Sequence, residues 1–240
     1  MISILRGLAV IWFVFTLVFM SVRLLPSDPI MADANSGRLT TEQVEARRQQ
    51  LGLNKPIHQQ YFDYLANVLQ GNWGYSFVSS ESVRDLVWGR LGPTMALAFG
   101  SFGIALFIGI GLGIAAVSNN RLISHCADVC IAISQAIPIY VSALLGIYLF
   151  SLKLNWFPSG GSSTPIHLIL PCSILGFHTA SPLASVLRTN LKVTYGSPYI
   201  LTAHAKGLYP IDILEHALRV AILPTVSVLA LQAGFLLSGT

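Results

Sequence analysis

The chain has 240 residues, of which 53% are hydrophobic and only 10% are charged. A soluble domain usually carries about 25% charged residues, because its surface has to face water. The formal net charge is +4, the mean hydropathy is +0.66, and no basic cluster interleaves with aromatic residues as a nucleic-acid-binding surface would require. The composition therefore excludes an ordinary soluble protein and a nucleic-acid partner, and it predicts a chain solvated mainly by lipid.

Five stretches lack charged residues and are long enough, or nearly so, to cross a bilayer as helices, which takes about 20 apolar residues. Since a helix satisfies its own backbone polar groups in lipid, we predict an all-α polytopic membrane protein with five transmembrane helices. The first is interpreted as an uncleaved helix rather than a signal peptide, because no small-residue cleavage site follows it. The five stretches are residues 7–22, 93–119, 129–152, 165–187 and 220–240.

The basic residues of the short loops predict the orientation of these helices, because cytoplasmic loops carry an excess of lysine and arginine. With the N-terminus in the cytoplasm, Lys153 lies in the short outer loop. The basic residues on the cytoplasmic side are then Arg6, Arg121, Arg188, Lys192, Lys206 and Arg219. We therefore predict a cytoplasmic N-terminus.

The segment after the first transmembrane helix is predicted to form a helical insertion on the outer side. Thr40 and Gln43 have the spacing of a capping box, and the helix that they begin should end at Gly52. A second helix should cover residues 57–70. Residues 82–91 have one apolar face, so they should lie along the outer interface and lead into the second transmembrane helix.

These elements divide the chain into a first transmembrane helix (1–25), a periplasmic helical segment (26–92) and a membrane core (93–240). Within the core, residues 189–221 form a cytoplasmic segment. A helix begun by Ser197 and Pro198 should stop at Gly207, and another should begin after Pro210. This pattern predicts a helix–glycine–helix elbow, with an ordinary loop and a kinked junction as the alternative.

The elbow carries a family resemblance. Thr202-Ala-His-Ala-Lys-Gly-Leu208, followed by His216-Ala-Leu-Arg219 and Leu223-Pro224, resembles the cytoplasmic loop of ABC importer permeases, most closely the oligopeptide, dipeptide and nickel branch. The resemblance extends over essentially the whole chain, through residues 23–29, 51–57, 60–61, 71–77, 156–160 and 236–240.

Two features depart from the family pattern. The elbow has His204 where arginine is expected. Family members also continue beyond Gly239-Thr240 with a sixth transmembrane helix, so we expect this chain to be truncated at its C-terminus.

The resemblance implies a multi-pass permease subunit of an ATP-driven importer in the bacterial inner membrane, forming half of a translocation path for di- and oligopeptides. The implied partners are a sibling permease, cytoplasmic ABC ATPase subunits, a periplasmic or extracellular substrate-binding protein and membrane lipid. Nickel or metallophore uptake is the alternative within the family. The implied ATPase-coupling residues are Ala203, His204, Ala205, Lys206, Gly207, Leu208 and Tyr209.

The chain itself is not expected to be an enzyme. It contains no Gly-Lys dipeptide and therefore no Walker A loop, so ATP and magnesium would be bound by partner subunits and no cofactor by this chain. A membrane-embedded enzyme is the competing class. Ser101 lies between two glycines, but the second, third and fifth predicted helices contain no histidine that could serve as its base, so we predict no catalytic residue.

Four residues are candidates for lining the translocation path. Pro138 should kink the third helix and free the carbonyl of Ser134, with Gln135 beside it, although a purely structural kink is an equal alternative. Gln232 is polar at membrane depth in the fifth helix.

No metal site is predicted. His167 and His178 share a helix face but lie roughly 16 Å apart, which is too far for one ion. In the second helix, Ala105, Gly109 and Gly113 form a small-residue stripe that should let another helix approach closely.

The predicted orientation can be tested with single cysteines at Gln49 and Ser197, in a background where Cys126, Cys130 and Cys172 are replaced. Because the two positions lie on opposite sides, a membrane-impermeant thiol reagent should label Gln49→Cys from outside and Ser197→Cys only after the membrane is opened. Labelling of both from the same side would contradict this topology.

Overall fold

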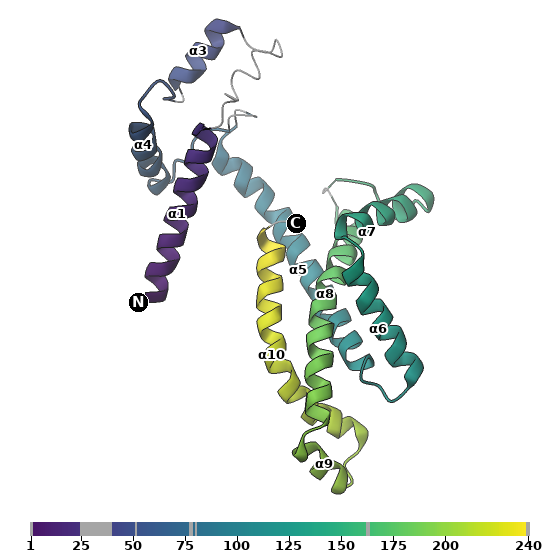
Figure 1. Ribbon diagram of the computed structural model, residues 1–240. Coiled ribbons are helices and arrows are strands. Elements are labelled where there is room, and N and C mark those ends of the chain that lie inside the picture. The colour runs from purple at the N-terminus through teal and green to yellow at the C-terminus, as the bar shows by residue number, and fades with distance from the viewer. Residues whose placement is uncertain are drawn as a thin grey trace. The chain divides into compact units, whose positions relative to one another are not determined.

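The computed structural model describes residues 2–24, 40–50, 52–76, 79, 81–161 and 164–238. Every regular element in these ranges is helical, which confirms the predicted all-α class (Figure 1). The chain divides into two compact units, Met1–Arg90 and Leu91–Thr240, and each is described by itself. Residues 25–39, which hold most of the family-like stretch 23–29, and residues 239–240, at the end of the fifth predicted helix, lie outside the described residues.

The first unit contains helices α1 (Ile2–Leu24), α3 (Thr41–Gln50) and α4 (Ile57–Leu69). The predicted capping box is present: the Thr40 N–H donates to Gln43 Oε1 at 2.9 Å, and the Gln43 N–H donates to Thr40 Oγ1 at 3.4 Å. Gly52 follows α3 with a φ of +65°, a left-handed conformation that favours glycine. The two helices predicted within the insertion are therefore confirmed, as α3 and α4.

Aromatic side chains join α4 to α1. Phe15 stacks on Tyr64 with ring centroids 5.4 Å apart, and Phe19 meets Tyr61 edge-to-face at 5.3 Å. The Thr16 hydroxyl lies 2.8 Å from the Tyr61 hydroxyl. Phe19 is only 6% exposed as a result. The apolar face of α4 thus serves to hold the insertion against the first transmembrane helix.

The long helix α5 (Val83–Ala115) differs from the prediction at its start. Residues 82–91 were expected to lie along the outer interface and lead into a transmembrane helix beginning at Pro93. Instead, α5 is continuous and Pro93 lies inside it. Proline usually ends or kinks a helix, but apolar helices tolerate it because neighbouring groups compensate for the lost hydrogen bond.

The third predicted transmembrane helix is broken rather than kinked. Helix α6 (Arg121–Ala136) is capped by Ile137, and after a bend of 101° the chain continues as α7 (Ile139–Gly146). Helix α7 leads directly into the π-helix η1 (Ile147–Lys153). Ile137 is extended, with φ −90° and ψ 124°, because the ring of a following proline disfavours helical geometry. Pro138 therefore acts as predicted, but its effect is larger than a kink.

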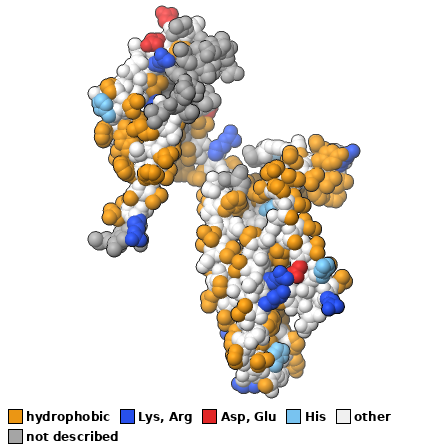
Figure 2. All heavy atoms as spheres, viewed as in Figure 1, with side chains coloured by type: hydrophobic (Ala, Val, Ile, Leu, Met, Phe, Trp, Pro, Cys, Tyr) orange, Lys and Arg blue, Asp and Glu red, His pale blue; other side chains and the backbone are white. Residues whose placement is uncertain are grey.

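The remaining helices are α8 (Ile166–Tyr195), α9 (Pro198–Ala205) and α10 (Pro210–Ser238). Helices α8 and α10 contact each other and are connected at one end through α9 (Figure 1). Four described helices are long and apolar enough to span a membrane, and the bent pair supplies a fifth candidate, which agrees with a polytopic membrane protein. Figure 2 shows hydrophobic side chains over much of the visible surface of the helices, as contact with lipid requires.

The predicted small-residue stripe of α5 faces α8. Ala105 is 1% exposed, and a Cβ added to Gly109 would lie 2.7 Å from Leu183 Cδ2 and 3.0 Å from the Ala180 carbonyl oxygen. A Cβ on Gly113 would lie 2.9 Å from Leu187 Cδ2. The absence of side chains thus sets how closely the two helices approach.

Gly109→Ala should destabilise the second unit, whereas Gly111→Ala on the same helix should not. The new methyl group would clash with a buried leucine and with backbone, and such overpacking costs about 1–3 kcal/mol. A Cβ on Gly111 meets nothing within 4 Å. Thermal unfolding of the purified variants in detergent measures the difference, and equal midpoints would contradict close packing of α5 on α8.

Candidate functional site

The predicted elbow between α9 and α10 is present. Ser197 is extended and precedes Pro198, the first residue of α9. At the other end, the Gly207 N–H donates to the His204 carbonyl at 2.9 Å and the Leu208 N–H donates to the Ala203 carbonyl at 3.2 Å. This pair of bonds is the Schellman motif, which requires a left-handed residue, and Gly207 has a φ of +75°.

The inner face of α9 anchors the elbow to the transmembrane helices. Ile200 is fully buried and Ala203 is 8% exposed. Both belong to a core cluster with two leucines of α8 and three residues of α10: Leu187, Leu191, Ile213, Ala217 and Ala221. Leu208 is half-buried against the same cluster. Helix α9 therefore shares a buried core with both α8 and α10.

The outer face of the elbow consists of exposed residues. Four large apolar side chains point away from the core: Tyr199 (44% exposed), Leu201 (62%), Tyr209 (76%) and Ile211 (69%). His204, Ala205, Lys206 and Gly207 are exposed beside them. Of the residues that the resemblance assigns to ATPase coupling, Tyr209 is exposed, whereas Leu208 packs partly within its own chain. Sequence reasoning missed Tyr199, Leu201 and Ile211, which are identified only once Ile200 and Ala203 define the buried face.

Charged residues of the elbow lie at helix ends where they interact favourably with the helix dipole. Lys206 is the C-cap of α9, where a cation interacts favourably with the helix dipole. Asp212 lies in the first turn of α10, and Glu215 pairs with Arg219 one turn later. Among the described residues Lys206 has no ion-pair partner of its own, so its charge is available to a partner.

The candidate pathway residues occupy different environments. Ser134 is 5% exposed and its hydroxyl donates to the Phe177 carbonyl of α8 at 3.3 Å. Gln135 and Pro138 are exposed at the break between α6 and α7, while Gln232 is half-buried on α10. The structure therefore places three of the four residues at the break, and no contact within its described part connects them with the fourth.

Polar side chains tie the broken span to α8. Ser181 is buried and its hydroxyl donates to the Ile131 carbonyl of α6 at 2.9 Å. His178 Nε2 lies 2.9 Å from the Ser142 hydroxyl of α7. Nearer the elbow, Arg188 Nη2 and Asp128 Oδ2 form an ion pair at 2.7 Å. Such interhelical bonds contribute about 0.6–2 kcal/mol each in membrane proteins, so together they hold α6 and α7 in place.

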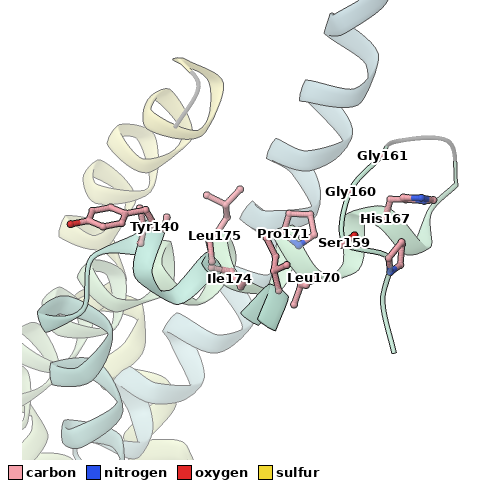
Figure 3. Close-up of a pocket in the computed structure, with 13 residues that line it drawn as sticks. Tyr140, Ser159, Gly160, Gly161, His167, Leu170, Pro171, Ile174 and Leu175 are labelled. Carbon is pink, nitrogen blue, oxygen red and sulfur yellow. The ribbon is translucent and has the colours of Figure 1, made fainter. Parts of the chain in front are cut away.

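A cavity of about 420 Å³ lies between the bent segment and the first half of α8. Its walls come from α7, η1, α8 and the loop Pro158–Gly161. Figure 3 shows the loop and His167 at one end and Tyr140 at the other, with apolar α8 side chains between them. Sequence reasoning did not anticipate this cavity, because it depends on the 101° bend. The lining residues are Ile139, Tyr140, Ala143, Ile147, Pro158, Ser159, Gly160, Gly161, His167, Leu170, Pro171, Ile174 and Leu175.

The two histidines of α8 have separate hydrogen-bonding partners. His167 Nδ1 lies 2.8 Å from the Thr164 hydroxyl, whereas His178 contacts Ser142. In the described ranges no group of three or more His, Cys, Asp or Glu side chains is arranged to hold a metal ion. The described geometry thus offers interaction surfaces and a cavity as candidate sites.

Comparison with known proteins identifies similar sequences. Residues 105–240 match the family described as "Binding-protein-dependent transport system inner membrane component", and residues 1–98 match the N-terminal domain of such membrane components. A protein of Brucella suis named as a peptide permease is 34% identical over 98% of this chain and 78% of its own length. A glutathione transport system permease protein of Escherichia coli is 35% identical over 96% of this chain and 76% of its own length.

Gly207→Ala should lower the stability of the elbow, whereas Gly196→Ala should leave it unchanged or slightly raise it. Both glycines cap helices, but only Gly207 is left-handed, and that conformation costs a residue with a Cβ about 1–2 kcal/mol. No atom lies within 4 Å of a Cβ at Gly207, so only backbone strain is tested. Limited proteolysis at the elbow, compared between the variants, measures the effect. Equal cleavage rates would contradict the left-handed turn.

Proposed function

Since the chain belongs to the family of binding-protein-dependent transport system inner membrane components, we propose that it is a permease subunit of a peptide importer and that its elbow binds the ATPase subunit. As a member of this family it is an inner-membrane permease component of an ABC transporter and not a catalytic enzyme. ATP hydrolysis on this proposal takes place in a separate cytoplasmic subunit.

The observation that carries the proposal is the outer face of the elbow. Tyr199 and Leu201 of the short helix α9, Tyr209 of the connecting turn and Ile211 at the start of α10 are exposed there. Lys206 lies among them in sequence and has no ion-pair partner within the described residues. Contiguous exposed apolar surface bordered by polar residues is typical of protein interfaces, and apolar helix faces bind in grooves. The outer face of the elbow therefore suits an apolar groove on a partner whose rim is acidic.

The anchoring of the elbow supports a role in coupling. An ATPase that moves α9 would move a segment whose inner face shares a buried core with α8 and α10. Interiors packed at this density transmit displacement rather than absorb it. Hydrolysis in the partner could in this way change the position of the transmembrane helices.

A peptide substrate is favoured by the names of the relatives. One similar protein is named as a peptide permease and another as a glutathione permease, and glutathione is itself a small peptide derivative. No described cluster of metal-ligating side chains favours nickel. On this proposal a sibling permease completes the path, a substrate-binding protein delivers the peptide from outside, and the N-terminus is cytoplasmic.

The exposed residues at the break between α6 and α7 are proposed to face the path. Gln135 and Pro138 are exposed there, in a region otherwise dominated by apolar side chains. The carbonyl of Ser134 has lost its usual helical donor, because Pro138 has no N–H. The exposed amide of Gln135 can hydrogen-bond a peptide backbone in passing.

Leu201→Ser and Tyr209→Ser should each weaken binding of the ATPase subunit about tenfold or more, because truncation of a central apolar contact typically costs 1–2 kcal/mol or more. Co-purification of the ATPase with the tagged permease measures the effect. Leu154→Ser is the matched control, since Leu154 is 47% exposed but lies after η1, away from the elbow in sequence. Equal retention of the ATPase by all three variants would refute the proposed docking surface.

A further inference from the structure

We propose that the cavity between α7, η1 and α8 is a subsite that accepts one uncharged, apolar side chain of the transported peptide. The inference rests on the proposed function in taking a peptide as the substrate. It assigns a ligand class to a cavity that lies outside the elbow and outside the residues at the α6–α7 break.

The lining of the cavity lacks charged side chains within the described residues. Among the described residues that line it there is no Asp, Glu, Lys or Arg. Aliphatic side chains form much of the lining: Leu170, Ile174 and Leu175 of α8 (Figure 3), with Ala143 of α7 and Ile147 of η1. A charged group entering this space would lose its water without gaining a counter-ion, which is strongly unfavourable. An apolar side chain would instead gain free energy by leaving water.

Hydrogen-bonding groups lie at the ends of the cavity rather than along its walls. Ser159, Gly160 and His167 stand at one end and Tyr140 at the other (Figure 3). A peptide residue has the matching distribution, with an apolar side chain attached to a polar backbone. A phospholipid matches less well, since its headgroup phosphate would find no lysine or arginine in the lining.

The loop Pro158–Gly161 at one end of the cavity packs closely against the ring of His167. Gly161 has a φ of +105°, and a Cβ there would lie 2.9 Å from His167 Cδ2. The imidazole is held in turn by Thr164, 2.8 Å from its Nδ1. The loop therefore lies directly against the ring, and this wall of the cavity has a defined shape.

The far wall is held equally well. The break at Pro138 turns α7 across α8, and the contact between Ser142 and His178 secures it there. A cavity of about 420 Å³ falls near the lower end of the range of roughly 300–1,000 Å³ for ligand sites. This volume suits one large side chain with its adjoining backbone rather than a whole oligopeptide.

A cysteine protection experiment tests the subsite directly. In a thiol-free background, Ala143→Cys changes little in volume, and Leu144→Cys on the same helix is the matched control because Leu144 is 67% exposed and does not line the cavity. In the importer reconstituted with its partners in vesicles, glycyl-phenylalanyl-glycine should slow alkylation of Ala143→Cys several-fold. Triglycine should not slow this alkylation, and neither peptide should change the alkylation rate of the control Leu144→Cys.

Transport gives the second readout. Ala143→Phe would fill the cavity, and a site that gains from burying a phenyl ring should lose about tenfold in preference for glycyl-phenylalanyl-glycine over triglycine. Leu144→Phe should keep the preference of the natural protein. If Ala143→Phe does not assemble, Ile174→Ala enlarges the same cavity and should shift preference toward a tryptophan-containing peptide.

The outcomes separate the subsite from the proposed function. If the natural importer takes up neither peptide, the proposed function fails. If the importer takes up peptides, the subsite is refuted by either of two results: glycyl-phenylalanyl-glycine and triglycine protect Ala143→Cys equally, or neither peptide protects it. Protection by vesicle lipid alone, unchanged by peptide, would also overturn it and assign the cavity to an acyl chain.

Discussion

Close packing against α8 is the constraint on which the arrangement of the second unit depends. Lipid provides no hydrophobic force between helices, so they associate through close contact and polar bonds. Both kinds of contact converge on α8: glycines of α5 receive Leu183 and Leu187, while Ser181, His178 and Arg188 hold α6 and α7. The elbow and α10 share its last buried leucines. Helix α8 thus positions both proposed sites.

The two proposed sites lie at opposite ends of this helix. Leu170 lines the cavity and Leu187 belongs to the core that anchors the elbow, so 17 residues, or about 25 Å of helix, separate them. The cavity and the elbow therefore both contact α8, although Pro171 and Pro182 interrupt its backbone hydrogen bonds between them.

Features fixed by local chemistry could be predicted from the sequence. The capping box at Thr40, the turns at Gly52 and Gly207, and the small-residue stripe of α5 each depend on neighbouring residues in the chain, and all are present. The family could also be recognised, because its matching segments extend over the whole chain.

Features that depend on contacts between residues distant in sequence could not be predicted. Pro138 indicates that a helix is disturbed, but the 101° bend also depends on Ser142 and His178 meeting across 36 positions. The partial burial of Leu208 could not be predicted either, because it depends on a core formed by residues distant in sequence. Pro93 was treated as a boundary, although a long apolar helix accommodates it.

The π-helical geometry of η1 makes the cavity sensitive to the length of the chain. In a π-helix each N–H bonds to the carbonyl five residues earlier, as the Leu154 N–H does with Leu149. A π-helical turn holds one residue more than an α-helical turn, so deleting one residue from Ile147–Lys153 would allow an ordinary α-helical turn. The side chains of this segment would then be redistributed around the helix axis, and the start of the loop Pro158–Gly161 would shift. Relatives that differ by a single insertion or deletion here would therefore present a different cavity wall, even where every lining side chain is the same.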